Sequence, residues 1–92
     1  MLSISRSIRG QREARRLSQH EVARLSGVPQ SNYSKIELGK VDPRASTLID
    51  IARALDLELM LVPKELVPVV QSLYDDHVRL EERPLFAATG DE

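Results

Sequence analysis

The chain lacks several features that would place it in particular classes of protein. It has no cysteine, which excludes a disulfide framework and a thiolate zinc site and is typical of a reducing cytosol. No apolar run approaches the roughly 20 residues of a membrane span, and the amino terminus carries neither a charged leader nor a long apolar stretch. With 92 residues, 41% hydrophobic, 3% aromatic and 29% charged, the sequence predicts one small, helix-rich, cytoplasmic domain.

The net charge of −1 conceals an uneven distribution of charge along the chain. Residues 1–53 hold ten of the thirteen Lys and Arg and five acidic residues, a balance of +5, whereas residues 54–92 hold three basic and nine acidic residues, a balance of −6. A basic segment followed by an acidic one predicts a single face that attracts a polyanion such as nucleic acid. Charges that merely solvate helix faces are the alternative.

Glycine and proline divide the first part of the chain into short segments with helical periodicity. We predict helices over residues 3–16, from Ser18 to Gly27, from Pro29 or Gln30 to Gly39, and over residues 45–55. The second helix opens with a capping box formed by Ser18 and Glu21, and Gly27 ends it in a left-handed conformation. The apolar residues expected at helical spacing, most of them facing inward, are Ile4, Ile8, Leu17, Val22, Ala23, Leu25, Tyr33, Ile36, Leu48, Ile51, Ala52 and Leu55.

The periodicity changes after this segment. Residues 57–62 alternate like a strand, with Leu57, Leu59 and Leu61 on one face. A lone strand leaves its backbone groups unpaired and no second strand-like run is visible, so we expect the segment to pair with its twin in a second copy, as an antiparallel ribbon. An extension of the preceding helix is the alternative. The expected dimerisation segment, residues 57–63, contains Leu57, Leu59, Met60, Leu61 and Val62.

Residues 64–92 are expected to form one more helix and a tail. Pro68 is tolerated near the start of this helix, and the tail begins near Arg83 and reads as extended. The apolar residues that line one side of the predicted helix are Leu66, Val69, Val70, Leu73, Val78 and Leu80. The chain is therefore divided into a domain of residues 1–56, the segment 57–63, and residues 64–92.

The segment from Leu17 to Lys40 indicates function most clearly. Two short helices joined by a tight turn at Gly27-Val28 have the layout of a helix-turn-helix, whose second helix can enter the major groove of DNA while the first spans the backbone. Gln and Asn can pair with adenine and Lys can donate to guanine, so the exposed residues of the helix from Pro29 or Gln30 to Gly39 suit base reading. These residues are Gln30, Ser31, Asn32, Ser34 and Lys35.

The sequence over about residues 2–56 resembles the Cro/C1-type (XRE) helix-turn-helix family. The residues that carry the resemblance are Arg9, Arg12, Glu13, Arg15, Leu17, Ser18, Gln19, Glu21, Ala23, Gly27, Val28, Ser34, Ile36, Glu37 and Gly39. The departures are Gln11, Arg16, Val22, Tyr33 and Leu38; Arg16 stands where glycine is frequent. The resemblance implies an all-α, five-helix, lambda-repressor-like domain, here followed by a short β-strand that pairs across a homodimer.

The same resemblance implies roles for individual residues. Gln30, Ser31 and Lys35 would reach base edges, and Asn32 would contact both base and backbone. Arg12 and Glu37 would form a partly buried ion pair between the first helix and the end of the third. The residues that would hold DNA phosphates, and so add salt dependence with little sequence choice, are Gln19, Lys40, Arg44 and either Arg6 or Arg9.

The run of residues 54–63 resembles the end of HipB-type antitoxins. That resemblance implies a HipA-like kinase toxin as partner, which is bound and kept inactive while the pair represses its own operon. The predicted function is thus a homodimeric repressor of an operator built as an inverted repeat, and the antitoxin of such a kinase. The alternatives are a stand-alone repressor of the same family without a toxin, and a pure protein-interaction module.

Several residues have a structural interpretation as well as a functional one. Tyr33 is expected in the core rather than as a stacking residue, and Leu38 could be either an apolar plug or a dimer contact. His20 and His77 lack carboxylate neighbours at ligand spacing and are expected at the surface, without a metal. No nucleophile with a base and no glycine-rich phosphate loop is visible in the sequence, so neither an enzyme nor a cofactor is expected.

Overall fold

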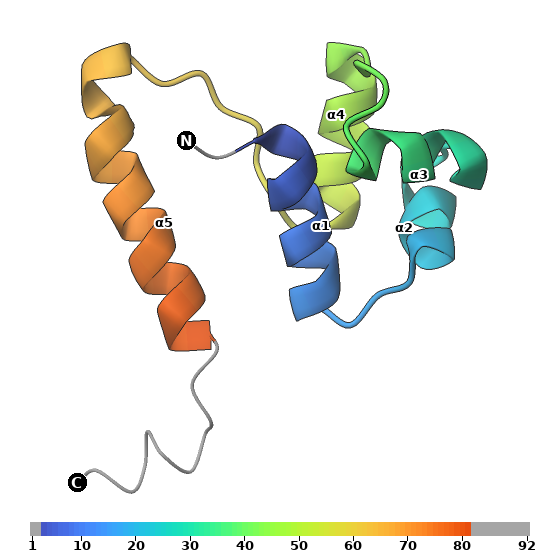
Figure 1. The fold of residues 1–92 in the computed structure, drawn as a ribbon, viewed down its shortest axis with the longest axis horizontal. Helices are drawn as coiled ribbons and strands as arrows, with labels where there is room; N and C mark the ends of the chain where they lie inside the picture. Colours follow the sequence, from blue (N-terminus) through green and yellow to red (C-terminus); the bar gives the residue numbers. More distant parts are fainter. Residues whose placement is uncertain (1–2, 82–92) are drawn as a thin grey trace, which may run out of the picture. The chain divides into compact units, whose positions relative to one another are not determined.

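A computed structural model describes residues 3–81, which fall into two compact units divided between Met60 and Leu61. The first unit contains α1 (Ile4–Ala14), α2 (Gln19–Ser26), α3 (Gln30–Glu37) and α4 (Ala45–Ala54) (Figure 1). The second contains a short 3-10 helix, η1 (Lys64–Leu66), and α5 (Val67–Glu81). The predicted set of five α-helices is confirmed. The expected extended tail from Arg83 lies outside the described residues.

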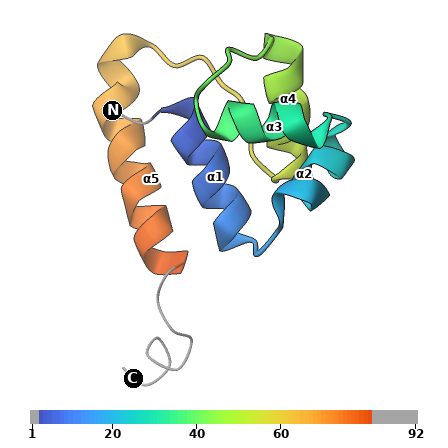
Figure 2. The ribbon, with the colours of Figure 1, turned by 45° about the vertical axis from the view of Figure 1, so that its right-hand side comes forward.

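The core of the first unit is built from all four of its helices. α2 packs against both α3 and α4, and α1 packs against α3. Figure 2 shows α2 and α3 close together, joined by a short connection. The buried apolar residues of this core are Ile8, Val22, Ala23, Tyr33, Ile36, Ile51 and Leu55. Every one of them was expected from the helical periodicity, so the pattern of apolar residues identifies the core.

Two of the expected apolar residues, Ile4 and Leu25, are exposed. Ile4 is 54% exposed, because it lies in the first turn of α1, beside a hollow of about 410 Å³ that it shares with Ile36 and Leu48 and does not fill. Ile4 is therefore not buried as expected, although it lines the same hollow as Ile36 and Leu48. Leu25, near the end of α2, is also exposed, which the spacing of apolar residues alone did not indicate.

The first four helices end in the same way. The residue that follows the last turn is left-handed in each case: Arg16 (φ 58°), Gly27 (φ 75°), Gly39 (φ 73°) and Asp56 (φ 59°). The next amide N–H then donates to the carbonyl five residues before it, as from Leu17 to Arg12 (3.0 Å) and from Leu57 to Ala52 (2.7 Å). These are Schellman motifs, which bond carbonyls that the helix itself leaves free.

Two of these four motifs use a residue other than glycine. Arg16 ends α1 at Ala14, two residues before the predicted end, and has the left-handed backbone for which a glycine is favoured. A left-handed conformation costs a side-chain-bearing residue roughly 1–2 kcal/mol. Gln11, which also departs from the family pattern, lies in α1. It donates from Nε2 to the carbonyl of Leu55 (3.2 Å) and so joins α1 to the end of α4.

Residues 57–63 form neither a helix nor a strand within the single chain described. The left-handed Asp56 ends α4, so the alternative that this segment extends the helix is wrong. Leu57 packs against the core of its own unit, whereas Leu59, Met60 and Leu61 are exposed, Leu61 by 99%. Pairing with a second copy is not tested by one chain and stays a prediction.

The second unit exposes much of its apolar surface. Pro68 is the second residue of α5, where the amide it lacks would have no partner within the helix. The exposed apolar residues are Leu66, Val67, Val69, Val70, Leu73 and Leu80. Among residues 3–81, no helix is both long enough and apolar enough to cross a membrane.

Candidate DNA-binding site

α3 has one buried face and one exposed face. Tyr33, Ile36 and Glu37 are buried against the rest of the first unit, and Tyr33 is fully covered, so its expected place in the core is confirmed. The residues predicted to read bases occupy the rest of the helix: Gln30, Ser31, Asn32 and Lys35 are exposed and Ser34 is half-buried. One face of α3 is therefore polar and exposed, and the opposite face is packed against the rest of the first unit.

Local capping fixes how α2 leads into α3. The predicted capping box is present: the Glu21 amide donates to Ser18 Oγ (3.0 Å), and the Ser18 amide donates to Glu21 Oε1 (2.8 Å). These bonds to the backbone and side chain of Ser18 lower the pKa of Glu21. At the other end of α2, Gly27 turns the chain, and Pro29 precedes the first residue of α3. The angle between the two helices is thus set by residues local to the turn.

A buried carboxylate holds α1, α2 and α3 together. Glu37 accepts hydrogen bonds from Arg12 Nε (2.6 Å) and Arg12 Nη2 (3.2 Å), which is the pair implied by the family resemblance. Glu37 also accepts from Gln19 Nε2 (3.1 Å) and from the hydroxyl of Tyr33 (2.5 Å). Arg12 donates in addition from Nη1 to the carbonyl of Leu17 (2.9 Å). We call Arg12, Gln19, Tyr33 and Glu37 the Glu37 network.

The pKa directions follow from burial and from this bonding. Burial raises the pKa of the Glu37 carboxyl, but the hydrogen bonds from Arg12, Tyr33 and Gln19 together outweigh it, and the net pKa is lowered. Burial, and then the bond to Glu37, raise the pKa of Tyr33. The hydrogen bond to Glu37 raises the pKa of Arg12. The network therefore holds one buried anion beside one cation, with every other partner neutral.

Two residues at the start of α2 contact α3. Gln19, predicted to bind a phosphate, has its amide nitrogen on Glu37 in the absence of DNA. His20, expected only to lie at the surface, is exposed, and its Nδ1 lies 3.1 Å from Oε1 of Gln30. This second contact was missed in the sequence because the two residues lie ten positions apart, in different helices.

The other residues predicted to hold phosphates are exposed cations. Arg9 forms an exposed ion pair with Glu13 (3.3 Å) one turn along α1. Lys40 follows Gly39 at the end of α3, and Arg44 precedes the first residue of α4. Within residues 3–81, no ion pair involves Arg6, Lys40 or Arg44. These cations remain available to a polyanion.

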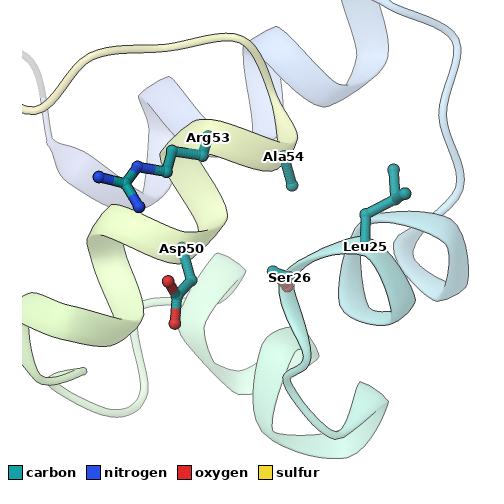
Figure 3. A pocket seen from close by; sticks show the side chains of 5 residues that line it. All are labelled: Leu25, Ser26, Asp50, Arg53 and Ala54. Carbon is teal, nitrogen blue, oxygen red and sulfur yellow. The ribbon is translucent and has the colours of Figure 1, made fainter.

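Leu38 and a separate hollow are two further features of the surface of the first unit. Leu38 follows the last residue of α3 and is 60% exposed, so it is no apolar plug. A hollow of about 380 Å³ lies between the end of α2 and α4, lined by Leu25, Ser26, Asp50, Arg53 and Ala54 (Figure 3). None of the predicted DNA contacts lines it. The part of the chain that is described holds no group of three or more His, Asp or Glu able to bind a metal ion.

Comparisons with known proteins agree with this architecture. The model of the family described as Helix-turn-helix matches residues 8–61, which include all of α2, α3 and α4. The chain belongs to this helix-turn-helix family. It is also 44% identical over 72 residues to a protein of Sinorhizobium fredii (strain NBRC 101917 / NGR234) named "Uncharacterized HTH-type transcriptional regulator y4dL". That similarity covers 78% of this chain and 37% of the relative, so the chain spans little more than a third of the relative's length. No solved structure matches the chain.

Proposed function

We propose that this protein is a sequence-specific DNA-binding repressor of transcription. The observation that carries the proposal is the exposed polar face of α3, which belongs to a helix-turn-helix and whose underside is fixed by Tyr33, Ile36 and Glu37. A helix of this kind can lie in a major groove and pair with base edges. Its base-reading residues are Gln30, Ser31, Asn32, Ser34 and Lys35.

The backbone contacts belong to residues around this face. Lys40 and Arg44 lie in the connection between α3 and α4, and Gln19 lies at the start of α2, where free amides favour an anion. Arg6 or Arg9 on α1 adds a further contact. Such contacts hold the protein on the duplex without selecting a sequence. They use three of the ten basic residues in the first part of the chain.

The proposed repressor is a homodimer. The exposed side chains of Leu59, Met60 and Leu61 suit pairing with the same segment of a second copy, as does the backbone of residues 58–62, which forms no backbone hydrogen bond within residues 3–81. A two-fold axis then presents two copies of α3 about one helical turn of DNA apart, so the operator is an inverted repeat. In this division, residues 1–56 bind DNA, residues 57–63 dimerise and residues 64–92 serve other contacts.

The second unit favours an additional role as an antitoxin. The second unit exposes apolar residues such as Leu66 in η1 and Leu73 in α5, which a partner would cover. The resemblance of residues 54–63 to HipB-type antitoxins points to a HipA-like kinase toxin as that partner. The toxin would be bound and kept inactive while the pair represses its own operon. A stand-alone repressor without a toxin is the alternative.

A titration of the protein against the DNA upstream of its own gene tests the repressor. We expect the Gln30→Ala and Lys35→Ala double variant to lose at least about 30-fold in affinity, because each base contact contributes about 1–3 kcal/mol. Lys64→Ala, which removes the same charge from the second unit, is the matched control and should bind like the wild type. Unchanged affinity of the double variant would remove α3 from the interface.

A co-expression experiment tests the antitoxin role. The untagged product of a neighbouring kinase-like gene should copurify with the tagged full chain, and the Leu66→Glu and Leu73→Glu double variant should lose it while still binding DNA. Both leucines are exposed and lie in the second unit, so the double variant changes no residue of the first unit. If the cells express the kinase and it does not copurify with the tagged chain, the result favours the stand-alone repressor.

A further inference from the structure

A contact between exposed residues joins the two helices of the helix-turn-helix. His20 is the second residue of α2 and Gln30 is the first residue of α3, and Nδ1 of His20 lies 3.1 Å from Oε1 of Gln30. Both residues are exposed, and neither belongs to the buried core. The contact therefore adds little to the packing of the domain and acts mainly on the side chain of Gln30.

The contact ties the end of the Gln30 side chain to His20. An amide oxygen only accepts, so with Oε1 on His20 the imidazole donates from a protonated Nδ1; in the other tautomer Nδ1 accepts from the NH₂ group of Gln30. Either bond limits where the Gln30 amide lies and how freely it rotates.

The other polar side chain at the start of α2 does not do this. Gln19 donates from Nε2 to the buried Glu37 carboxylate (3.1 Å) and forms no side-chain hydrogen bond with Gln30. Arg24, the nearest basic residue of α2 toward its other end, lies about one helical turn farther along, and Gln30 forms no other side-chain hydrogen bond among residues 3–81. His20 is thus the group that orients Gln30 before DNA arrives.

We propose that His20 is a positioning residue that determines the base preference at the position that Gln30 reads. The inference rests on the proposed function, in which α3 reads DNA. Adenine offers an acceptor and a donor in the major groove and needs both ends of the glutamine amide, whereas guanine offers two acceptors and suits the NH₂ group alone. An amide tied to His20 keeps one arrangement of its donor and acceptor toward the bases and so prefers one purine, while a freely rotating amide accepts both.

Selection from a random-sequence duplex library of about 30 base pairs tests this directly, with base frequencies measured at every enriched position. The Gln30→Ala variant identifies the position that Gln30 reads. His20→Phe keeps a ring of similar size but cannot form the hydrogen bond, and it should lower the preference for one purine over the other at that position by about 2- to 10-fold, the value of one immobilised side chain. His20→Gln, which can donate from its own amide, should restore the preference.

The outcomes separate the inference from the function on which it rests. Wild-type protein that enriches no sequence overturns the proposed function, and the role of His20 with it. A wild-type motif that Gln30→Ala alters and His20→Phe leaves intact overturns only the role of His20. A loss that spreads equally over all positions in His20→Phe also overturns it, because it would report a general structural effect. A combined His20→Phe and Gln30→Ala variant should match Gln30→Ala alone at the position in question.

Discussion

Removal of Arg12 is the most informative perturbation of this fold. Arg12 supplies two of the four hydrogen bonds that Glu37 accepts, and the side chains of the pair are 14% and 2% exposed. In Arg12→Met the carboxylate stays buried without a counter-ion. Breaking one side of a buried pair costs about 3–5 kcal/mol. We expect the free energy of unfolding of the first unit to fall by that amount.

Urea unfolding followed by tyrosine fluorescence measures this loss. In a Tyr74→Phe background the buried Tyr33 is the one tyrosine that remains, so the signal reports the first unit alone. With a slope of about 1 kcal/mol per molar urea, the midpoint should move down by about 3 M or more, at fixed protein concentration. Arg9→Ala breaks the exposed pair with Glu13 and, as matched control, should cost less than about 1 kcal/mol.

A second substitution tests the reason for the loss. Glu37→Gln in the Arg12→Met background removes the orphaned charge and should recover part of the stability, so the double variant unfolds at higher urea than Arg12→Met. If Arg12→Met is already unfolded without urea, the double variant should fold. A loss near 1 kcal/mol for Arg12→Met, or a double variant whose loss relative to the wild type equals the sum of the two single losses, would refute the reasoning.

Three further predictions follow from named contacts. The lowered pKa of Glu37 means that its contribution to stability is complete above the unfolded value of about 4.3 and is lost as pH falls through the folded value, so thermal melting between about pH 3 and pH 7 should show an acid-side loss that Glu37→Gln reduces. The left-handed backbone of Arg16 and Gly27 predicts opposite signs for two substitutions: Arg16→Gly should stabilise and Gly27→Ala should destabilise, each by about 1 kcal/mol in urea unfolding, and equal signs would contradict the assignment. Lys40→Ala and Arg44→Ala should each lower the slope of log affinity against log salt by about 1, whereas unchanged slopes would show that neither residue contacts a phosphate.

Local signals in the sequence predicted the helix-turn-helix well. The capping box at Ser18 and Glu21 and the glycine at position 27 fix the ends of α2 through contacts within a few residues, and such contacts can be inferred from neighbouring letters alone. The apolar spacing likewise identified the core. It failed at Ile4, because periodicity gives the direction of a side chain and not whether another element covers it.

Features that depend on contacts far apart in the chain were not visible in the sequence. Gln11 bonds to a carbonyl 44 residues away, and the partners of Gln19 and His20 lie in α3. The ends of α1 and α4 were also placed one or two residues too late, since Arg16 and Asp56 adopt the backbone that a glycine would have signalled. Only the dimer can show whether residues 57–63 pair as a strand.

The central claim is that two copies of α3 lie in the major groove of one duplex. Dimethyl sulfate, which modifies N7 of guanine in the major groove, tests it on the duplex that the protein selects. The account predicts two protected patches related by two-fold symmetry, about one helical turn apart, with two chains bound per duplex. A single protected patch, or undiminished reactivity at every guanine of a duplex saturated with protein, would contradict it.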